Sequence, residues 1–179
     1  VRTRGGSTGV ADLAGNRLAA DSTSTFTTAA GGGGTTAYLS DLAYTVTANG
    51  WGPVEKDRSN GEQAAGDGGP LTLNGTVYAK GLGTNAASDV RYAMNGTCTS
   101  FTVKVGVDDE ITSSTASVIF RIYADGTLLM SSTAMGATTA TQTLTVSVTG
   151  RTTLQLVVDP NGTPDYDHGD WADAQLTCS

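Results

Sequence analysis

The sequence of 179 residues predicts an all-β fold: a two-sheet antiparallel β-sandwich, jelly-roll-like in topology. Residues 101–107 and 144–148 alternate apolar and polar side chains, so each segment should cover a core with one face only. Short segments of this kind recur between turn residues from residue 38 to the end of the chain. No segment in that region has the sustained 3.6-residue period that would indicate a helix.

We expect about eight or nine antiparallel strands, which is an ordinary number for two packed sheets. The segments with strand signals, some of them short, are residues 38–48, 71–73, 76–78, 89–94, 101–107, 118–123, 128–130, 142–148, 154–158 and 171–178. The dipeptide Asn74-Gly75 separates two short apolar segments, and this pair favours a type I′ hairpin turn. Residues 49–69 form a long polar connection, and loops of that length in a compact domain are usually functional or disordered.

The charge and composition exclude some partners. Seventeen acidic and ten basic residues give a net charge of -7, which argues against nucleic acid and anionic membrane surfaces. No segment approaches the about 20 apolar residues of a membrane span, so membrane insertion is not expected. Charged residues make up only 15% of the chain, while Thr, Ser, Gly and Ala are abundant, which is typical of secreted β proteins. We therefore expect a secreted, extracellular protein.

The first 36 residues differ from the rest of the chain. Residues 9–21 followed by 24–28 resemble the last hairpin of a bacterial immunoglobulin-like domain. We assign residues 1–29 to the closing strands of such a domain, 30–36 to a glycine-rich linker and 37–179 to the sandwich. A strand without a sheet of its own should either be disordered or pair with the edge of its own sandwich or a neighbouring chain.

The two cysteines, Cys98 and Cys178, are too few for a zinc site, and each borders an expected strand. A disulfide between them fits a secreted protein, and the alternative is a pair of buried free thiols.

Acidic residues concentrate around the only histidine, in the run from Asp165 to Asp173. Clustered carboxylates need a cation, a polar ligand or full solvation, because they repel one another. We predict a structural calcium ion, and a solvated acidic turn is the alternative. The candidate ligands are Asp108, Asp109, Glu110, Asp159, Asp165 and Asp167.

Six motifs occur in order between residues 38 and 173. They are Tyr38-Leu-Ser-Asp-Leu42, Gly50-Trp-Gly-Pro-Val54, Leu73-Asn-Gly75, Tyr78-Ala-Lys-Gly-Leu-Gly-Thr-Asn-Ala86, Val105-Gly-Val-Asp-Asp-Glu110 and Asp167-His-Gly-Asp-Trp-Ala-Asp173. Together they resemble NPCBM, which is family 51 of the carbohydrate-binding modules, from about residue 38 to 178. The resemblance implies a β-sandwich appended to secreted bacterial glycoside hydrolases and adhesin-like proteins. It also implies glycans that contain galactose as partners.

Two positions depart from the pattern of that family. Asn85 stands where the Gly-Leu-Gly motif is usually followed by His, and Gly169 stands where Asp-His-Ala-Asp-Trp has Ala. Asn can donate and accept hydrogen bonds but never titrates, so sugar binding could survive with an altered preference or could be lost.

A sugar site needs donors and acceptors for hydroxyl groups and an aromatic face for the apolar side of the ring. The candidate sugar-binding residues are Trp51, Glu55, Asp57, Arg58, Asn85, His168, Asp170 and Trp171. We expect them to converge from the Trp51 loop, the Asn85 turn and the loop at residues 168–171, on a β scaffold. Each tryptophan could instead fill the core, and His168 could instead support a neighbouring group.

These observations favour a non-catalytic carbohydrate-binding module for terminal galactose-type glycans. An enzyme would need paired carboxylates, such as Glu55 or Glu110 with Asp170, acting as acid and base. Domains of this kind more often bind than cleave, and the sequence has no Ser-His-Asp or Cys-His pattern. The alternative function is that of a structural or interaction module in a cell-surface assembly.

Overall fold

A computed structural model describes residues 2–3, 7–17, 19–23 and 34–179, in two units that comprise residues 1–33 and 34–179. In the first unit, β1 (Arg2–Thr3) pairs antiparallel with β2 (Ser22–Thr23). The described strands of this unit thus pair with each other. The predicted linker overlaps residues 30–33, which lie outside the described part. Its last two residues belong to β3 (Thr35–Tyr38) of the second unit.

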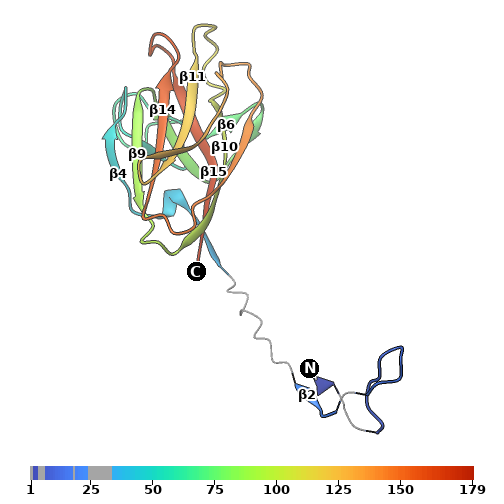
Figure 1. Ribbon diagram of the computed structural model, residues 1–179. Helices are drawn as coiled ribbons and strands as arrows, with labels where there is room; N and C mark the ends of the chain where they lie inside the picture. Colours follow the sequence, from blue (N-terminus) through green and yellow to red (C-terminus); the bar gives the residue numbers. More distant parts are fainter. Residues whose placement is uncertain (1, 4–6, 18, 24–33) are drawn as a thin grey trace. The chain divides into compact units, whose positions relative to one another are not determined.

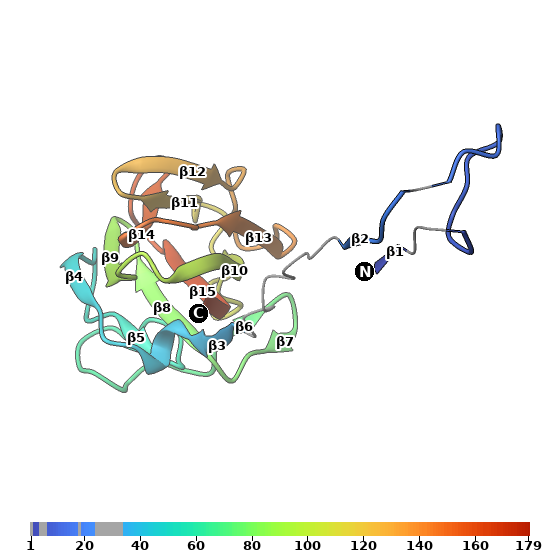
Figure 2. The same cartoon turned by 60° about the horizontal axis from the view of Figure 1, so that its bottom comes forward.

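The second unit is a sandwich of two antiparallel sheets, which confirms the predicted fold class (Figure 1). One sheet has the order β13-β10-β15-β8-β5, with β3 also paired to β15, and the other has the order β12-β11-β14-β9-β4. Figure 2 shows the second of these sheets as a layer packed across the first. The bounds not yet given are β4 (Thr45–Ala48), β5 (Glu55–Lys56), β8 (Gly81–Asn85), β9 (Ser88–Ala93), β10 (Cys98–Val107), β11 (Val118–Ala124), β12 (Thr127–Ser131), β13 (Gln142–Ser147), β14 (Thr153–Pro160) and β15 (His168–Cys178).

The core lies between the two sheets and follows the alternation of the sequence. Every second residue of β11 and β14 is buried, including Phe120 and Leu156. The ring of Phe120 meets the ring of Trp171 edge to face, with centroids 5.0 Å apart. Burial of each large apolar side chain of this kind contributes about 1.5–3 kcal/mol to folding.

The predicted hairpin at Asn74-Gly75 is confirmed: β6 (Thr72–Leu73) pairs with β7 (Thr76–Val77), and both turn residues have positive φ. Strand β8 was not among the expected strands. It pairs with β15 on one side and β5 on the other, and all five of its residues are buried. The only helical element of the described residues is the 3₁₀ turn η1 (Leu39–Asp41), and none of them forms a helix that could cross a membrane.

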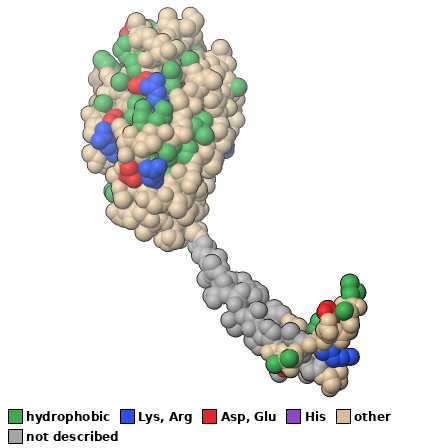
Figure 3. All heavy atoms as spheres, viewed as in Figure 1, with side chains coloured by type: hydrophobic (Ala, Val, Ile, Leu, Met, Phe, Trp, Pro, Cys, Tyr) green, Lys and Arg blue, Asp and Glu red, His purple; other side chains and the backbone are tan. Residues whose placement is uncertain are grey.

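The outward face of the β12–β4 sheet carries basic and acidic side chains next to one another (Figure 3). Arg91 pairs with Asp89, with Nη2 2.7 Å from Oδ2, and Arg121 pairs with Asp159. This face therefore balances its own charges.

Candidate functional site

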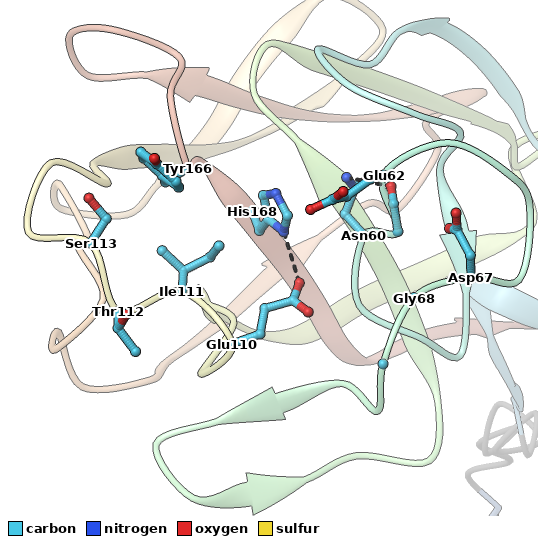
Figure 4. Close-up of a pocket in the computed structure, with 12 residues that line it drawn as sticks. Asn60, Glu62, Asp67, Gly68, Glu110, Ile111, Thr112, Ser113, Tyr166 and His168 are labelled. Carbon is cyan, nitrogen blue, oxygen red and sulfur yellow. Dashed lines mark hydrogen bonds and ion pairs between the residues drawn. The ribbon is translucent and has the colours of Figure 1, made fainter.

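Two adjoining cavities, each of about 660 Å³, open at the end of the sandwich where β15 begins. The lining of the Trp51 cavity includes Gly50, Trp51, Asn85, Ala86, Pro164 and Asp165. The lining of the Ile111 cavity includes Asn60, Asp67, Glu110, Ile111, Thr112 and Ser113 (Figure 4). Glu62, Tyr166 and His168 line both cavities. The two cavities therefore lie next to each other, with these three residues between them.

Trp51 stands on a turn that side-chain amides fix in place. The amide of Asn49 donates to the carbonyl oxygens of Trp51 and Gly52 at 2.8 and 3.0 Å, and its oxygen accepts the backbone N–H of Asn85. Gly50 bonds back to the carbonyl of Asn85, and a Cβ at Gly50 would lie 2.1 Å from the carbonyl oxygen of Ala86. The turn is thus locked against β8 while the indole stays 54% exposed. An exposed, preorganised aromatic face suits stacking against a sugar ring.

His168 begins β15 and pairs in register with Asn85, the last residue of β8. Its Nδ1 lies 2.8 Å from Oε1 of Glu110, and its side chain is only 13% exposed. Because a carboxylate only accepts, Nδ1 is the donor in this contact, and in the tautomer with its proton on Nδ1 the other nitrogen, Nε2, is an acceptor. In Figure 4 the ring lies in the middle of the site, with Tyr166 and Ser113 on one side and Glu62 and Asn60 on the other.

The loop of residues 57–70 forms one wall of the Ile111 cavity and is held by three residues that the sequence suggested as sugar ligands. Both oxygens of Glu55 accept the N–H of Gly66, at 2.8 and 2.9 Å. Arg58 donates to the carbonyl of Gly68, and Asp57 accepts from Lys80 and from the N–H of Gly81. None of the three lines either cavity. The hydrogen bonds of these three side chains are thus made within the protein itself.

Asp170 and Trp171 are fully buried and do not reach either cavity. Successive residues of a strand point to opposite faces, so the indole enters the core between the sheets and the carboxylate lies on the other face. Burial raises the pKa of Asp170 well above its ordinary value, and the adjacent Asp108 raises it further. The fold thus favours the uncharged form of Asp170. Of the predicted sugar ligands, only Trp51, Asn85 and His168 line the cavities.

The six predicted calcium ligands are not brought together. Among the described residues no three His, Cys, Asp or Glu side chains form a group that could hold a metal ion. Most of these carboxylates have hydrogen-bond or ion-pair partners in the protein, although Oδ2 of Asp167 is buried without one in the described part of the chain. Three aspartates accept backbone N–H groups: Asp108 from Thr72 and Glu110, Asp109 from Asn74 and Gly75, and Asp167 from Ser117. Glu110 is hydrogen-bonded to His168, and Asp159 pairs with Arg121. Asp165 lines the Trp51 cavity.

Sequence reasoning missed Glu62 and Tyr166, which line both cavities. Tyr166 is 59% exposed and has a φ of 65°, so its backbone turns the ring outward between two aspartates. An aromatic residue inside a polar loop next to the histidine was the available signal. The sequence gives no such signal for Glu62, because the polar, glycine-rich segment around it has the composition of a simple connecting segment.

Cys98 and Cys178 form a disulfide and are direct partners in the β10–β15 register, which confirms the predicted pairing. The bond ties the C-terminal strand to the start of β10. It is consistent with an oxidising compartment.

A two-sheet sandwich that carries an exposed tryptophan and a polar cleft at one end defines a class of protein, the β-sandwich binding modules. Residues 35–177 match the NPCBM/NEW2 domain family, and the chain belongs to that family. The predicted family is therefore confirmed, while the immunoglobulin-like assignment of residues 1–29 stays a prediction.

One relative is a protein of Renibacterium salmoninarum named "Putative endo-alpha-N-acetylgalactosaminidase". It is 43% identical over 144 residues, which cover 79% of this chain and 10% of that protein. The chain thus spans about a tenth of the length of this relative.

Two solved structures from Clostridium perfringens are similar. The module CBM51 of GH95, in complex with methyl-galactose, has a TM-score of 0.71 and 35% identity over 80% of this chain and 100% of its own. The structure of CBM51-2, in complex with GlcNAc, and INT domains of ZmpB has a TM-score of 0.72 and 32% identity over 80% of this chain and 32% of its own. The chain is thus related to carbohydrate-binding modules, as the sequence predicted.

Proposed function

We propose that residues 34–179 bind the terminal galactose-type sugar of a glycan in the Trp51 cavity, without cleaving it. The observation that carries this proposal is the half-exposed indole of Trp51, which lines one cavity together with Asn85 and His168. The indole offers a stacking surface for the apolar face of the sugar. Asn85 offers a donor and an acceptor, and Nε2 of His168 offers an acceptor.

The proposal is supported by the preformed state of these groups. The turn of Trp51 is locked by Asn49, and Glu110 fixes the ring of His168, so little side-chain entropy is lost on binding. A single sugar offers few buried atoms, so we expect millimolar to high micromolar dissociation constants, or roughly 4–6 kcal/mol. Neighbouring modules would supply avidity.

Family membership also supports a sugar ligand, because similar structures contain methyl-galactose and GlcNAc. We propose that the module belongs to a secreted bacterial protein that includes a glycosidase. The division of the chain into residues 1–29, 30–36 and 37–179 is also part of this proposal. Because β3 starts at Thr35, the last of these boundaries moves from residue 37 to residue 35. A structural calcium ion stays a prediction, and a melting temperature unaffected by chelator would contradict it.

The test is titration calorimetry of the full chain with methyl β-galactoside. Trp51→Ala and His168→Ala should each lower the affinity by tenfold or more, with nearly unchanged melting temperatures. Leu128→Ala is the matched control, because Leu128 is also an exposed apolar residue, 48% exposed on β12, and lines neither cavity. If the wild type binds neither galactosides nor GlcNAc, the structural or interaction role takes precedence.

A further inference from the structure

The two cavities share three lining residues, and this adjacency bears on what size of ligand fits them. Tyr166, His168 and Glu62 contact both spaces, so a ligand that fills one cavity is in position to continue into the other. We infer that the cavities are consecutive subsites for one uncharged glycan of at least two sugar units. The terminal sugar occupies the Trp51 cavity and the next sugar occupies the Ile111 cavity. This inference rests on the proposed function.

The volume of the site supports two sugars. Each cavity of about 660 Å³ is within the range of about 300–1,000 Å³ that small-molecule sites have. A monosaccharide of about a dozen non-hydrogen atoms occupies only part of one such cavity and leaves the other open. Tyr166 stands at the junction with its ring 59% exposed, so the site has a second aromatic surface besides Trp51.

The polarity of the Ile111 cavity suits hydroxyl groups. Its wall combines the hydroxyls of Thr112 and Ser113 and the carboxylate of Glu62 with the apolar side chain of Ile111. Figure 4 shows Ile111 on the floor between Thr112 and His168. Sugar hydroxyls need several donors and acceptors around one small apolar contact, and this wall provides them.

The charge of the site determines the class of glycan. Glu62, Asp67 and Glu110 line the Ile111 cavity, and Asp165 lines the Trp51 cavity, while no Lys or Arg of the described residues lines either one. Hydrogen bonds from the N–H of Ala64 and of Gln63 lower the pKa of Asp67, so it stays ionised. A sulfate or a sialic acid carboxylate in this cleft would lie within about one Debye length of several negative charges. The site therefore rejects anionic glycans.

The first experiment compares methyl β-galactoside with neutral galactose-terminated disaccharides in β1,3 and β1,4 linkage, by calorimetry on the full chain. At least one disaccharide should bind about tenfold more tightly than the monosaccharide. Ser113→Tyr and Thr112→Trp fill the Ile111 cavity and should reduce that ratio, measured within each variant, to about twofold or less. Thr112 is exposed and makes no contact with the bond between Ser113 and Thr115, so a folding defect in one variant leaves the other informative.

The second experiment places a 6-O-sulfate on the N-acetylglucosamine of the β1,4 disaccharide. We expect the sulfated form to bind at least fivefold more weakly at low salt, and the difference to shrink as salt is added. Glu62→Gln should also reduce the difference. Thr127→Lys is the control, because it adds the same unit of positive charge on β12, away from both cavities.

The outcomes separate the inference from the proposed function. If methyl β-galactoside fails to bind, the proposed function fails. If it binds but no disaccharide binds more tightly, or if the sulfated form binds as well as the neutral one, the inference is overturned while the proposed function stands.

Discussion

Both carboxylate oxygens of Glu55 accept the backbone N–H of Gly66, at 2.8 and 2.9 Å, and this contact connects β5 to the loop that carries Glu62. Glu55 is only 3% exposed, so its charge is satisfied inside the protein. The sequence predicts that this residue contacts sugar, and in the structure its carboxylate holds the loop that lines the Ile111 cavity.

Replacement of Glu55 by Ala should therefore lower both stability and binding. A hydrogen bond to a buried charged group contributes about 1.5–3 kcal/mol, so the free energy of unfolding in urea should fall by that amount. Glu55→Gln keeps one acceptor oxygen, so its free energy of unfolding should fall less than that of Glu55→Ala. Glu62→Gln removes an exposed charge from the same loop and should change the free energy of unfolding by less than about 0.5 kcal/mol. If Glu62→Gln lowers the free energy of unfolding as much as Glu55→Ala does, the loop-fixing role of Glu55 is contradicted.

Gly83 on β8 allows the same loop to lie flat against the sheet. A Cβ at Gly83 would lie 2.3 Å from the carbonyl carbon of Ser59 and 2.4 Å from the carbonyl oxygen of Arg58. Because these are backbone atoms, Gly83→Ala should push the loop away, lower the free energy of unfolding by about 1–3 kcal/mol and weaken sugar binding. Gly69→Ala is the matched control in the loop itself, since its nearest atom would lie at an ordinary 3.5 Å. If Gly83→Ala melts at the same temperature as the wild type and binds sugar equally well, this account is refuted.

Asp125 gives the stability a defined dependence on pH. Side-chain and backbone hydrogen bonds from Thr152 and Thr153 lower the pKa of Asp125 from 3.8 to about 2. A lowered pKa in the folded state stabilises the fold above the unfolded value, and this contribution disappears as pH falls from about 4 to about 2.

Asp125→Asn keeps the left-handed turn conformation that Asp125 adopts, at φ 48°, but removes the charge. Its melting temperature should be below that of the wild type at pH 7, and the two values should converge as pH falls to about 2. If the difference in melting temperature between the two proteins stays constant from pH 7 to about 2, the carboxylate of Asp125 is not the cause of that difference.

The disulfide should contribute strongly to stability, because it joins residues 80 positions apart in the sequence. In the chain-entropy description, a loop of this length corresponds to about 4 kcal/mol. Urea unfolding of the double variant Cys98→Ser/Cys178→Ser should show a loss of that order. Thiol titration of the denatured, unreduced protein should find no free thiols, and two free thiols would reject the bond.

The parts of the fold that sequence predicts well are those where local pattern and tertiary environment agree. The Asn74-Gly75 turn and the alternating strands β10, β11 and β13 each have one buried face, so their period of two is visible. Strand β8 was missed because both its faces are covered and two of its five residues are glycines. A strand without alternation and with glycines in its interior lacks both sequence signals.

The residues proposed for the candidate site can likewise be divided into those that line a cavity and those that do not. Trp51, Asn85 and His168 were identified because their side-chain types are unusual in a polar loop or in a family motif. Glu55, Asp57 and Arg58 have equally suitable chemistry, but the backbone of their own loop turns back to occupy them. Composition cannot distinguish a polar group that serves the backbone from one that serves a ligand, because hydrogen-bond partners depend on the path of the chain.

Strand β15 begins at His168, in the site, and ends at Cys178, which pairs in register with Thr35 at the start of β3. The chain thus enters and leaves the sandwich side by side, at the end away from the cavities (Figure 1). Eleven residues of extended chain span roughly 30 Å. A tether at either terminus of this unit would hold the end with the two cavities outward by that distance, and the module would project sideways from a longer polypeptide without adding to its contour length.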